Sequence, residues 1–294
     1  MNRIFKIGII YLILSLILES SSLLLGALPP SVTIYFGQYI TILFPVIIIA
    51  FAFKVDKYRF KLKSFKLTTI PYLLVIFLAA LPINGFLGSL TTFIFGENPN
   101  GIMAFTESLT VLPHQELFIM ALTPAICEEM MFRGLLLDKK SGLNMHGLAL
   151  LSGLMFSLFH VGYDQLIYTF ALGVIFAYAA IISGSIFPAM ILHFLNNGFG
   201  TILTMIIGPV EATEPVVNEV VTLASLLPWF LAALLGGTII VFVYRKLISL
   251  YDYDDKRRLE ANKDDLDLLN TEPKFITYTP QTVMFLYVII ANLI

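Results

Sequence analysis

Long apolar runs constrain this chain more than any other feature of its sequence. Eight of them reach or approach the roughly 20 residues that an α-helix needs to cross a bilayer. Their approximate bounds are 7–28, 32–53, 70–95, 117–137, 146–161, 165–183, 186–208 and 223–244. Of the 294 residues, 58% are hydrophobic and 13% are charged, which excludes an ordinary soluble globular domain. The sequence therefore predicts an all-α, multi-pass transmembrane helix bundle with eight spans.

Two shorter regions follow the bundle, which we expect to occupy residues 1–250. Residues 251–275 contain the run Asp-Tyr-Asp-Asp-Lys-Arg-Arg, which is too charged to pack and predicts a cytoplasmic tail. Residues 276–294 end the chain with an apolar segment of about 14 residues, which is short for a full span. Its length leaves open whether this segment crosses the membrane or lies at the interface.

The positions of the basic residues predict the orientation of the bundle. Lysine and arginine collect in loops that stay in the cytoplasm. In this chain they fall in five places, namely 3–6, 54–66, 133–140, 245–246 and 256–274. Threading eight spans from a cytoplasmic N-terminus puts all five on one side, and the loops on the other side carry acidic residues and no basic ones. We therefore expect a cytoplasmic N-terminus and a multi-pass protein of the cell membrane.

The remaining composition excludes several classes of function. The single cysteine, Cys127, cannot form an intramolecular disulfide or supply a cluster of thiolate metal ligands. The balance of 18 basic against 20 acidic residues gives no reason to expect a nucleic-acid partner. The expected partners are the lipid bilayer and a hydrophobic peptide or membrane-protein substrate.

The fourth apolar run carries three charged residues where lipid would surround a simple span. They are Glu128, Glu129 and Arg133. A charge at this depth costs about 2.5 to 3.5 kcal/mol on insertion scales, so each is a functional hypothesis. Glu129 and Arg133 are four residues apart, with the acid first, which favours an ion pair on one helix face. Glu128 points about 100° away from that face and needs another partner.

Two later runs carry polar side chains that can meet Glu128. His160 ends the fifth run, and His193 and Asn197 lie four residues apart on one face of the seventh. A carboxylate and a histidine can take a proton from water, while a histidine and an asparagine can stabilise an oxyanion. His160 reaches the depth of Glu128 only if its helix starts near His146 rather than near Lys140.

Each of these residues also has a purely structural interpretation. A single histidine on an apolar helix is more often a hydrogen-bonded packing residue than a catalyst, and Asn197 can bridge two helices. The pair of Glu129 and Arg133 can hold the bundle together without taking part in chemistry. The combination of all these side chains in one chain is what favours a catalytic site.

The three motifs Glu128-Glu129-x-x-x-Arg133, Phe156-x-x-x-His160 and His193-x-x-x-Asn197, in this order, resemble the CPBP family. This family comprises the CAAX proteases and bacteriocin-processing enzymes and is also called the Abi family. The resemblance covers a catalytic core of about 117–208. It implies an intramembrane endopeptidase of CAAX type that cleaves hydrophobic or membrane-inserted peptides, such as a pheromone or bacteriocin precursor or a prenylated protein.

The resemblance also implies a role for each motif residue. Glu128 would activate the attacking water together with His160, His193 and Asn197 would stabilise the oxyanion, and Glu129 and Arg133 would position the first motif. The sequence lacks His-Glu-x-x-His, the standard zincin motif. It still leaves two types of protease open: a glutamic type without a cofactor, or a metallo type with zinc on Glu128, His160 and His193.

Two other functions remain open at this stage. One is a non-catalytic immunity or regulatory adaptor of the membrane, in which the polar cluster only holds helices together. The other is a small-solute transporter, in which the same side chains line a path. The completeness of the three motifs favours the protease.

Overall fold

The computed structural model describes residues 3–55, 60–96, 111–138, 141–160, 162–207 and 221–252, and three further residues, Val283, Leu286 and Tyr287. The regular structure within these ranges is helical, and they contain no strand. The prediction of an all-α fold is confirmed. The expected charged tail and the C-terminal apolar segment lie almost wholly outside the described residues and stay predictions.

The first half of the chain forms three long helical stretches. Helix α1 is Arg3–Gly26. The second stretch joins α2 (Pro30–Gln38), the π-helical turn η1 (Tyr39–Leu43) and α3 (Phe44–Ala52). The short 3-10 turn η3 (Leu67–Thr69) leads into α4 (Ile70–Phe95).

The second half begins with the stretch that carries the first motif. It joins α6 (Pro113–Leu117), the π-helical turn η4 (Phe118–Leu122), α7 (Thr123–Glu129) and the π-helical turn η5 (Met130–Leu136). Four helices follow, which are α8 (Met145–Phe159), α9 (Tyr163–Ser183), α10 (Phe187–Ile207) and α11 (Leu223–Leu250).

Every apolar run of the sequence coincides with one of these stretches. Five stretches are long and apolar enough to cross a membrane: 31–52, 67–95, 163–183, 187–206 and 223–250. Two shorter apolar helices cover 5–18 and 145–159. The chain is thus a membrane protein with several apolar helices, whereas the count of eight spans and the cytoplasmic N-terminus stay predictions.

Local chemistry explains where several helices begin and end. The side chain of Asn144 accepts a hydrogen bond of 2.8 Å from the backbone of Gly147 and so caps the start of α8. Gly184 ends α9 with a φ of 63°, a left-handed conformation that glycine adopts without steric cost. Thr222 caps α11 through a reciprocal pair of hydrogen bonds with Ser225.

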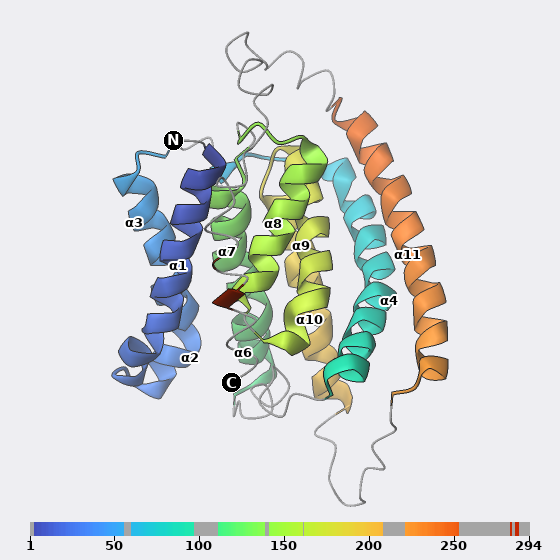
Figure 1. The fold of residues 1–294 in the computed structure, drawn as a ribbon, viewed down its shortest axis with the longest axis horizontal. Coiled ribbons are helices and arrows are strands. Elements are labelled where there is room, and N and C mark those ends of the chain that lie inside the picture. The colour runs from blue at the N-terminus through green and yellow to red at the C-terminus, as the bar shows by residue number, and fades with distance from the viewer. Residues whose placement is uncertain are drawn as a thin grey trace, which may run out of the picture.

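The helices form a bundle in which α7, α8, α9 and α10 occupy the middle (Figure 1). On one side, α1 and the stretch of α2, η1 and α3 pack against α7, η5 and α8 through one apolar cluster that includes Tyr11, Val46 and Phe132. On the other side, α4 and α11 pack against α9 and α10 through a second cluster that includes Leu73, Phe176 and Tyr244. The three motifs therefore lie between two apolar clusters.

Candidate active site

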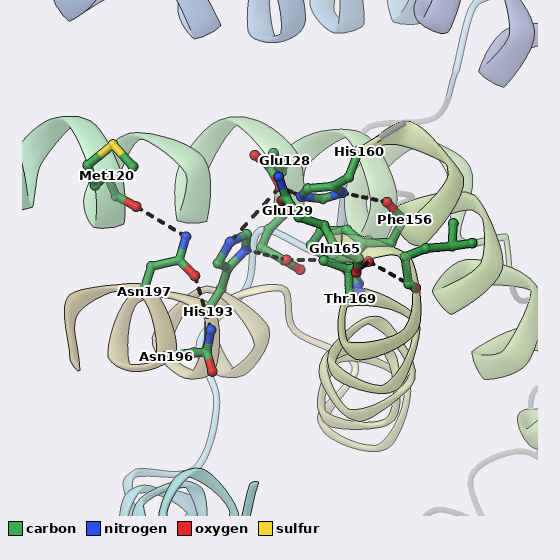
Figure 2. A network of polar contacts seen from close by, with 12 residues as sticks. Met120, Glu128, Glu129, Phe156, His160, Gln165, Thr169, His193, Asn196 and Asn197 are labelled. Carbon is green, nitrogen blue, oxygen red and sulfur yellow. Dashed lines mark hydrogen bonds and ion pairs between the residues drawn. The ribbon is translucent and has the colours of Figure 1, made fainter. Parts of the chain in front are cut away.

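Three side chains from three separate helices meet in the middle of the bundle. Glu128 lies on α7, His160 directly follows α8, and His193 lies on α10. Glu128 Oε2 is 3.8 Å from His160 Nε2 and 4.0 Å from His193 Nε2 (Figure 2). Both rings thus present the same nitrogen atom to the same carboxylate oxygen.

The start of α8 explains how His160 reaches this depth. The helix begins at Met145, after its Asn144 cap, and not at Lys140. Its 15 residues rise about 22 Å at 1.5 Å per residue, and His160 forms its C-terminal cap. Helix α8 therefore starts late enough for His160 to reach the depth of Glu128.

His193 faces both glutamates of the first motif, one with each of its two ring nitrogens. Its Nδ1 lies 2.9 Å from Glu129 Oε1, and its Nε2 faces Glu128. Adjacent residues on a helix point about 100° apart, yet an imidazole has nitrogen atoms on two edges and can contact both. The ring is 4% exposed and stacks on Phe176, with ring centroids 5.2 Å apart. His193 is therefore held in one orientation.

The partners of the two Nδ1 atoms determine where the ring hydrogens are. His160 Nδ1 lies 2.8 Å from the backbone carbonyl of Phe156, and His193 Nδ1 lies against the Glu129 carboxylate. Carbonyl and carboxylate oxygens only accept hydrogen bonds, so Nδ1 donates in both rings. In the neutral tautomers, both Nε2 atoms that face Glu128 consequently carry lone pairs.

Glu129 is paired with a buried arginine. Arg133 Nη1 lies 2.8 Å from Glu129 Oε1, which is the ion pair that the spacing predicted, and both side chains are 0% exposed. Arg133 Nη2 donates to the carbonyl of Gly173 at 2.6 Å, and the guanidinium carbon lies 4.7 Å from the ring centroid of Phe156. The attraction within a buried ion pair offsets its desolvation cost only when the pair has such additional partners. Here a carbonyl and an aromatic face are those partners.

The facing acceptor atoms leave room for one donor between them. Glu128 Oε2 is buried and makes no hydrogen bond to any part of the chain that the structure describes. A carboxylate oxygen buried in this way needs a partner. A water oxygen about 2.8 Å from Oε2 and from one Nε2 bridges a separation of 3.8 to 4.0 Å. The geometry thus suits a water that donates one hydrogen to Glu128 and the other to a histidine.

Asn197 lies one helical turn from His193, outside this group of three side chains. Its Nδ2 donates to the backbone carbonyl of Met120 at 3.1 Å, and its Oδ1 accepts from Asn196 Nδ2 at 3.1 Å. Figure 2 shows the amide directed toward Met120, on the side of His193 away from His160. The structure therefore links five of the six predicted site residues in one chain of contacts and places the sixth beside them.

The distances also test whether the three candidate ligands fit a zinc ion. Two ligand atoms about 2.1 Å from a tetrahedral ion are about 3.4 Å apart, which is less than the 3.8 Å and 4.0 Å observed here. Across the described ranges, no three histidine, cysteine or acidic side chains are placed to hold a metal ion. The arrangement does not fit zinc, and we derive no step through a metal.

Several contacts around the site could not be read from the motifs. Gly173 supplies a carbonyl to Arg133, and the buried Lys61 donates to the carbonyls of Arg133 and Leu137, at 2.8 Å each. Lys61 belongs to a basic loop, which the sequence interpreted only as a marker of orientation. The glycine gave no polar signal, because its carbonyl belongs to the backbone.

One family comparison bears on this arrangement. Residues 110–199 match the family model described as Rce1-like, "Type II CAAX prenyl endopeptidase Rce1-like". The family resemblance is confirmed. The match includes all six predicted site residues and leaves α1 to α4 and α11 outside it. It supports a CAAX-type intramembrane protease in general. No curated protein and no solved structure matches the chain.

Proposed function

We propose that this protein is an intramembrane endopeptidase of glutamic type that cleaves hydrophobic or membrane-associated peptides in the cell membrane. The observation that carries the proposal is the convergence of Glu128 Oε2 with the Nε2 atoms of His160 and His193. A structural polar cluster would pair its buried acceptors with donors. Here Glu128 Oε2 is buried without a hydrogen-bond partner in the part of the chain that the structure describes, and it faces the Nε2 atom of His160, which the contact of Nδ1 with a carbonyl leaves as an acceptor.

Water activation falls to Glu128 and His160. The ionised carboxylate takes a proton from the bridging water, and the water oxygen attacks the carbonyl carbon of the scissile peptide bond. The neutral Nε2 of His160 accepts the second hydrogen bond of that water and orients it. When the carbon–nitrogen bond breaks, the proton held by Glu128 passes to the leaving amine, so the site returns to its starting state.

Oxyanion stabilisation falls to His193. To donate to an oxyanion, Nε2 must carry a hydrogen, so His193 acts as an imidazolium. The Glu129 carboxylate at 2.9 Å from Nδ1 accepts the other ring hydrogen, and Arg133 in turn binds Glu129. Asn197 has a second amide hydrogen besides the one given to Met120, and this hydrogen is the second donor to the oxyanion.

The substrate class follows from the surroundings of the site and from the family. Glu128 is 9% exposed and lies within a bundle whose outer helices carry exposed apolar side chains along their length. A substrate that reaches it through lipid must itself be apolar or lipid-modified. The matching family is described as a prenyl endopeptidase, so a prenylated C-terminal peptide is the first substrate to test.

The test compares wild type with Glu128→Gln on fluorogenic peptides in detergent micelles, with each peptide in farnesylated and unmodified form. Cleavage should fall at least about 10³-fold in the variant, because the amide cannot accept the proton. Glu116→Gln, on the same helical stretch but outside the site, is the matched control and should retain wild-type activity. A chelator should leave wild-type cleavage unchanged.

Two outcomes would overturn parts of this proposal. Full activity of Glu128→Gln would remove the carboxylate from the mechanism. Chelator inhibition that zinc reverses would show that the three side chains close around a metal in the active protein, and the glutamic mechanism would be withdrawn.

A further inference from the structure

A row of three side-chain amides crosses from α4, by way of α10, to the helical stretch that carries Glu128. Asn84 Nδ2 on α4 donates to Asn196 Oδ1 at 2.6 Å, and Asn196 Nδ2 donates to Asn197 Oδ1 at 3.1 Å. Asn197 Nδ2 then donates to the Met120 carbonyl at 3.1 Å, and Figure 2 shows this last part of the row. We call these three side chains the amide row. Asn84 lies outside the segment that matches the family model.

A proline lies one α-helical turn after the acceptor at the end of the row. In an α-helix, the carbonyl of Met120 would accept from the backbone N–H of residue 124. Residue 124 is Pro124, which has no N–H. The chain widens into the π-helical turn η4 at Phe118–Leu122, and the Asn197 side chain donates to the carbonyl that the proline leaves without its α-helical donor.

The same carbonyl determines the direction of all three amides. A carbonyl only accepts, so Asn197 must turn its nitrogen toward Met120 and its oxygen toward Asn196. Asn196 must then offer its nitrogen to Asn197 and its oxygen to Asn84. A reversal of any one amide would place two oxygens or two nitrogens against each other. The orientation of Asn197 is therefore fixed from both sides.

We propose that Asn84 and Asn196 are positioning residues that hold Asn197 with its nitrogen toward Met120, so that the second amide hydrogen of this nitrogen can serve the oxyanion. This inference rests on the proposed role of Asn197 as an oxyanion donor. An amide free to rotate by 180° would present its oxygen to the oxyanion in part of the molecules and repel it. The row removes that alternative, so the second hydrogen of Asn197 Nδ2 is always available for the transition state.

The kinetic parameter that changes distinguishes this proposal from a purely structural role of the amide row. An oxyanion donor acts in the transition state, so its loss lowers kcat and leaves KM nearly unchanged. Removing one such donor costs about 10²- to 10³-fold in kcat, and disorder of that donor costs a part of it. We expect Asn196→Leu to lower kcat about tenfold and Asn84→Leu about threefold, each with KM within about twofold of wild type.

A matched control separates the amide row from helix packing. Phe77 of α4 packs edge-on against Phe199 of α10, with ring centroids 5.9 Å apart, and neither residue belongs to the amide row. Phe77→Leu loosens the same pair of helices and should leave kcat within about twofold of wild type. An equal loss of kcat in Phe77→Leu and Asn196→Leu would overturn the proposal.

A double-mutant cycle tests whether the row acts through Asn197. In Asn197→Ala the donor is gone, so adding Asn196→Leu should cause no further loss of kcat. Independent, multiplying losses would overturn the proposal. Full activity of Asn197→Ala would instead remove Asn197 from the mechanism and the row with it. If Asn197→Ala lowers kcat while Asn84→Leu and Asn196→Leu keep the wild-type kcat, the positioning role of the amide row is overturned and the role of Asn197 stands.

Folding of each variant is checked by size exclusion in detergent and by helical circular dichroism. If Asn196→Leu fails to fold, Asn84→Leu decides the question, because Asn84 lies on another helix and is two hydrogen bonds away from Asn197 along the row. A threefold loss of kcat that disappears in the Asn197→Ala background supports the row, and an unchanged kcat overturns it.

Discussion

His160 and His193 face the same oxygen atom of Glu128, yet their surroundings differ in charge and in exposure. His160 donates from Nδ1 to a neutral backbone carbonyl and is 20% exposed. His193 donates from Nδ1 to a carboxylate that pairs with a buried arginine, and it is 4% exposed. Both contacts fix the same tautomer. Only the second acceptor belongs to an ion pair.

This difference supports the separate tasks that we propose for two identical residue types. The more exposed ring of His160, bound to a carbonyl, suits an acceptor that orients water, whereas the enclosed ring of His193, bound to a carboxylate, suits a donor to an oxyanion. The family resemblance of the motifs Phe156-x-x-x-His160 and His193-x-x-x-Asn197 implied this division but gave no physical reason for it. The division depends on what each Nδ1 contacts in the folded chain.

The largest expected effect is the loss of either imidazole. His160→Ala and His193→Ala should each lower kcat by about 10²- to 10⁴-fold, which is the usual size of a general acid–base or oxyanion contribution. The difference in exposure gives a sharper test, which is rescue by free imidazole. Added imidazole should recover at least about tenfold in His160→Ala and nothing in the enclosed His193→Ala. Equal rescue of both variants would contradict the difference between the two sites.

The next effect concerns the charge behind His193. Glu129→Gln should lower kcat about 10²-fold through loss of the imidazolium, and it should cost about 3 to 5 kcal/mol of stability because Arg133 is left buried without a counter-charge. Adding Arg133→Met should restore most of the melting temperature, since an apolar pair can replace a buried ion pair. Activity should stay low in the double variant, and its recovery would show that the pair is only structural.

A smaller effect is expected where the backbone supports Arg133. A Cβ at Gly173 would lie 2.9 Å from Gly153 Cα, so Gly173→Ala should push α8 and α9 apart and move the carbonyl that Arg133 binds. We expect a loss of about 1 to 3 kcal/mol in thermal stability and a lower kcat. Gly88→Ala is the control, because a Cβ there has no atom within 4 Å. If Gly173→Ala melts and cleaves like Gly88→Ala, the close approach of α8 and α9 is not required.

The smallest effect concerns the C-terminal end of the helical stretch that carries Arg133. Lys61 donates to the Arg133 and Leu137 carbonyls, so Lys61→Met should lower thermal stability by about 1 to 3 kcal/mol and kcat only a few-fold. Lys63→Met, at an exposed side chain of the same loop, should behave like wild type. A loss of activity in Lys61→Met as large as that of Glu129→Gln would assign the lysine a direct role.

The sequence anticipated much of this arrangement. Residues 70–95 were expected as a helix and form α4 over the same range, and the spacing of Glu129 and Arg133 correctly gave their ion pair. Hydropathy and helical periodicity suffice for such statements, because both depend on neighbours along the chain. The roles of the six predicted site residues rest on the family resemblance and stay proposals.

Other features depended on contacts between distant segments. The spacing of the motifs could not show that one imidazole touches both glutamates, because this needs α7 and α10 to be adjacent and His193 to be fixed by Phe176. The amide row likewise joins Asn84 to residues more than one hundred positions later. No local pattern marks such a pair.

The sequence by itself determined that the chain is helical, that it enters a membrane, and which polar side chains interrupt its apolar runs. Apolar length and charge position fix these properties through the cost of placing polar groups in lipid. Only the tertiary structure decided which nitrogen faces which carboxylate and which amide hydrogen stays available. These choices depend on the direction of hydrogen bonds between helices, and that direction is set once the helices have packed.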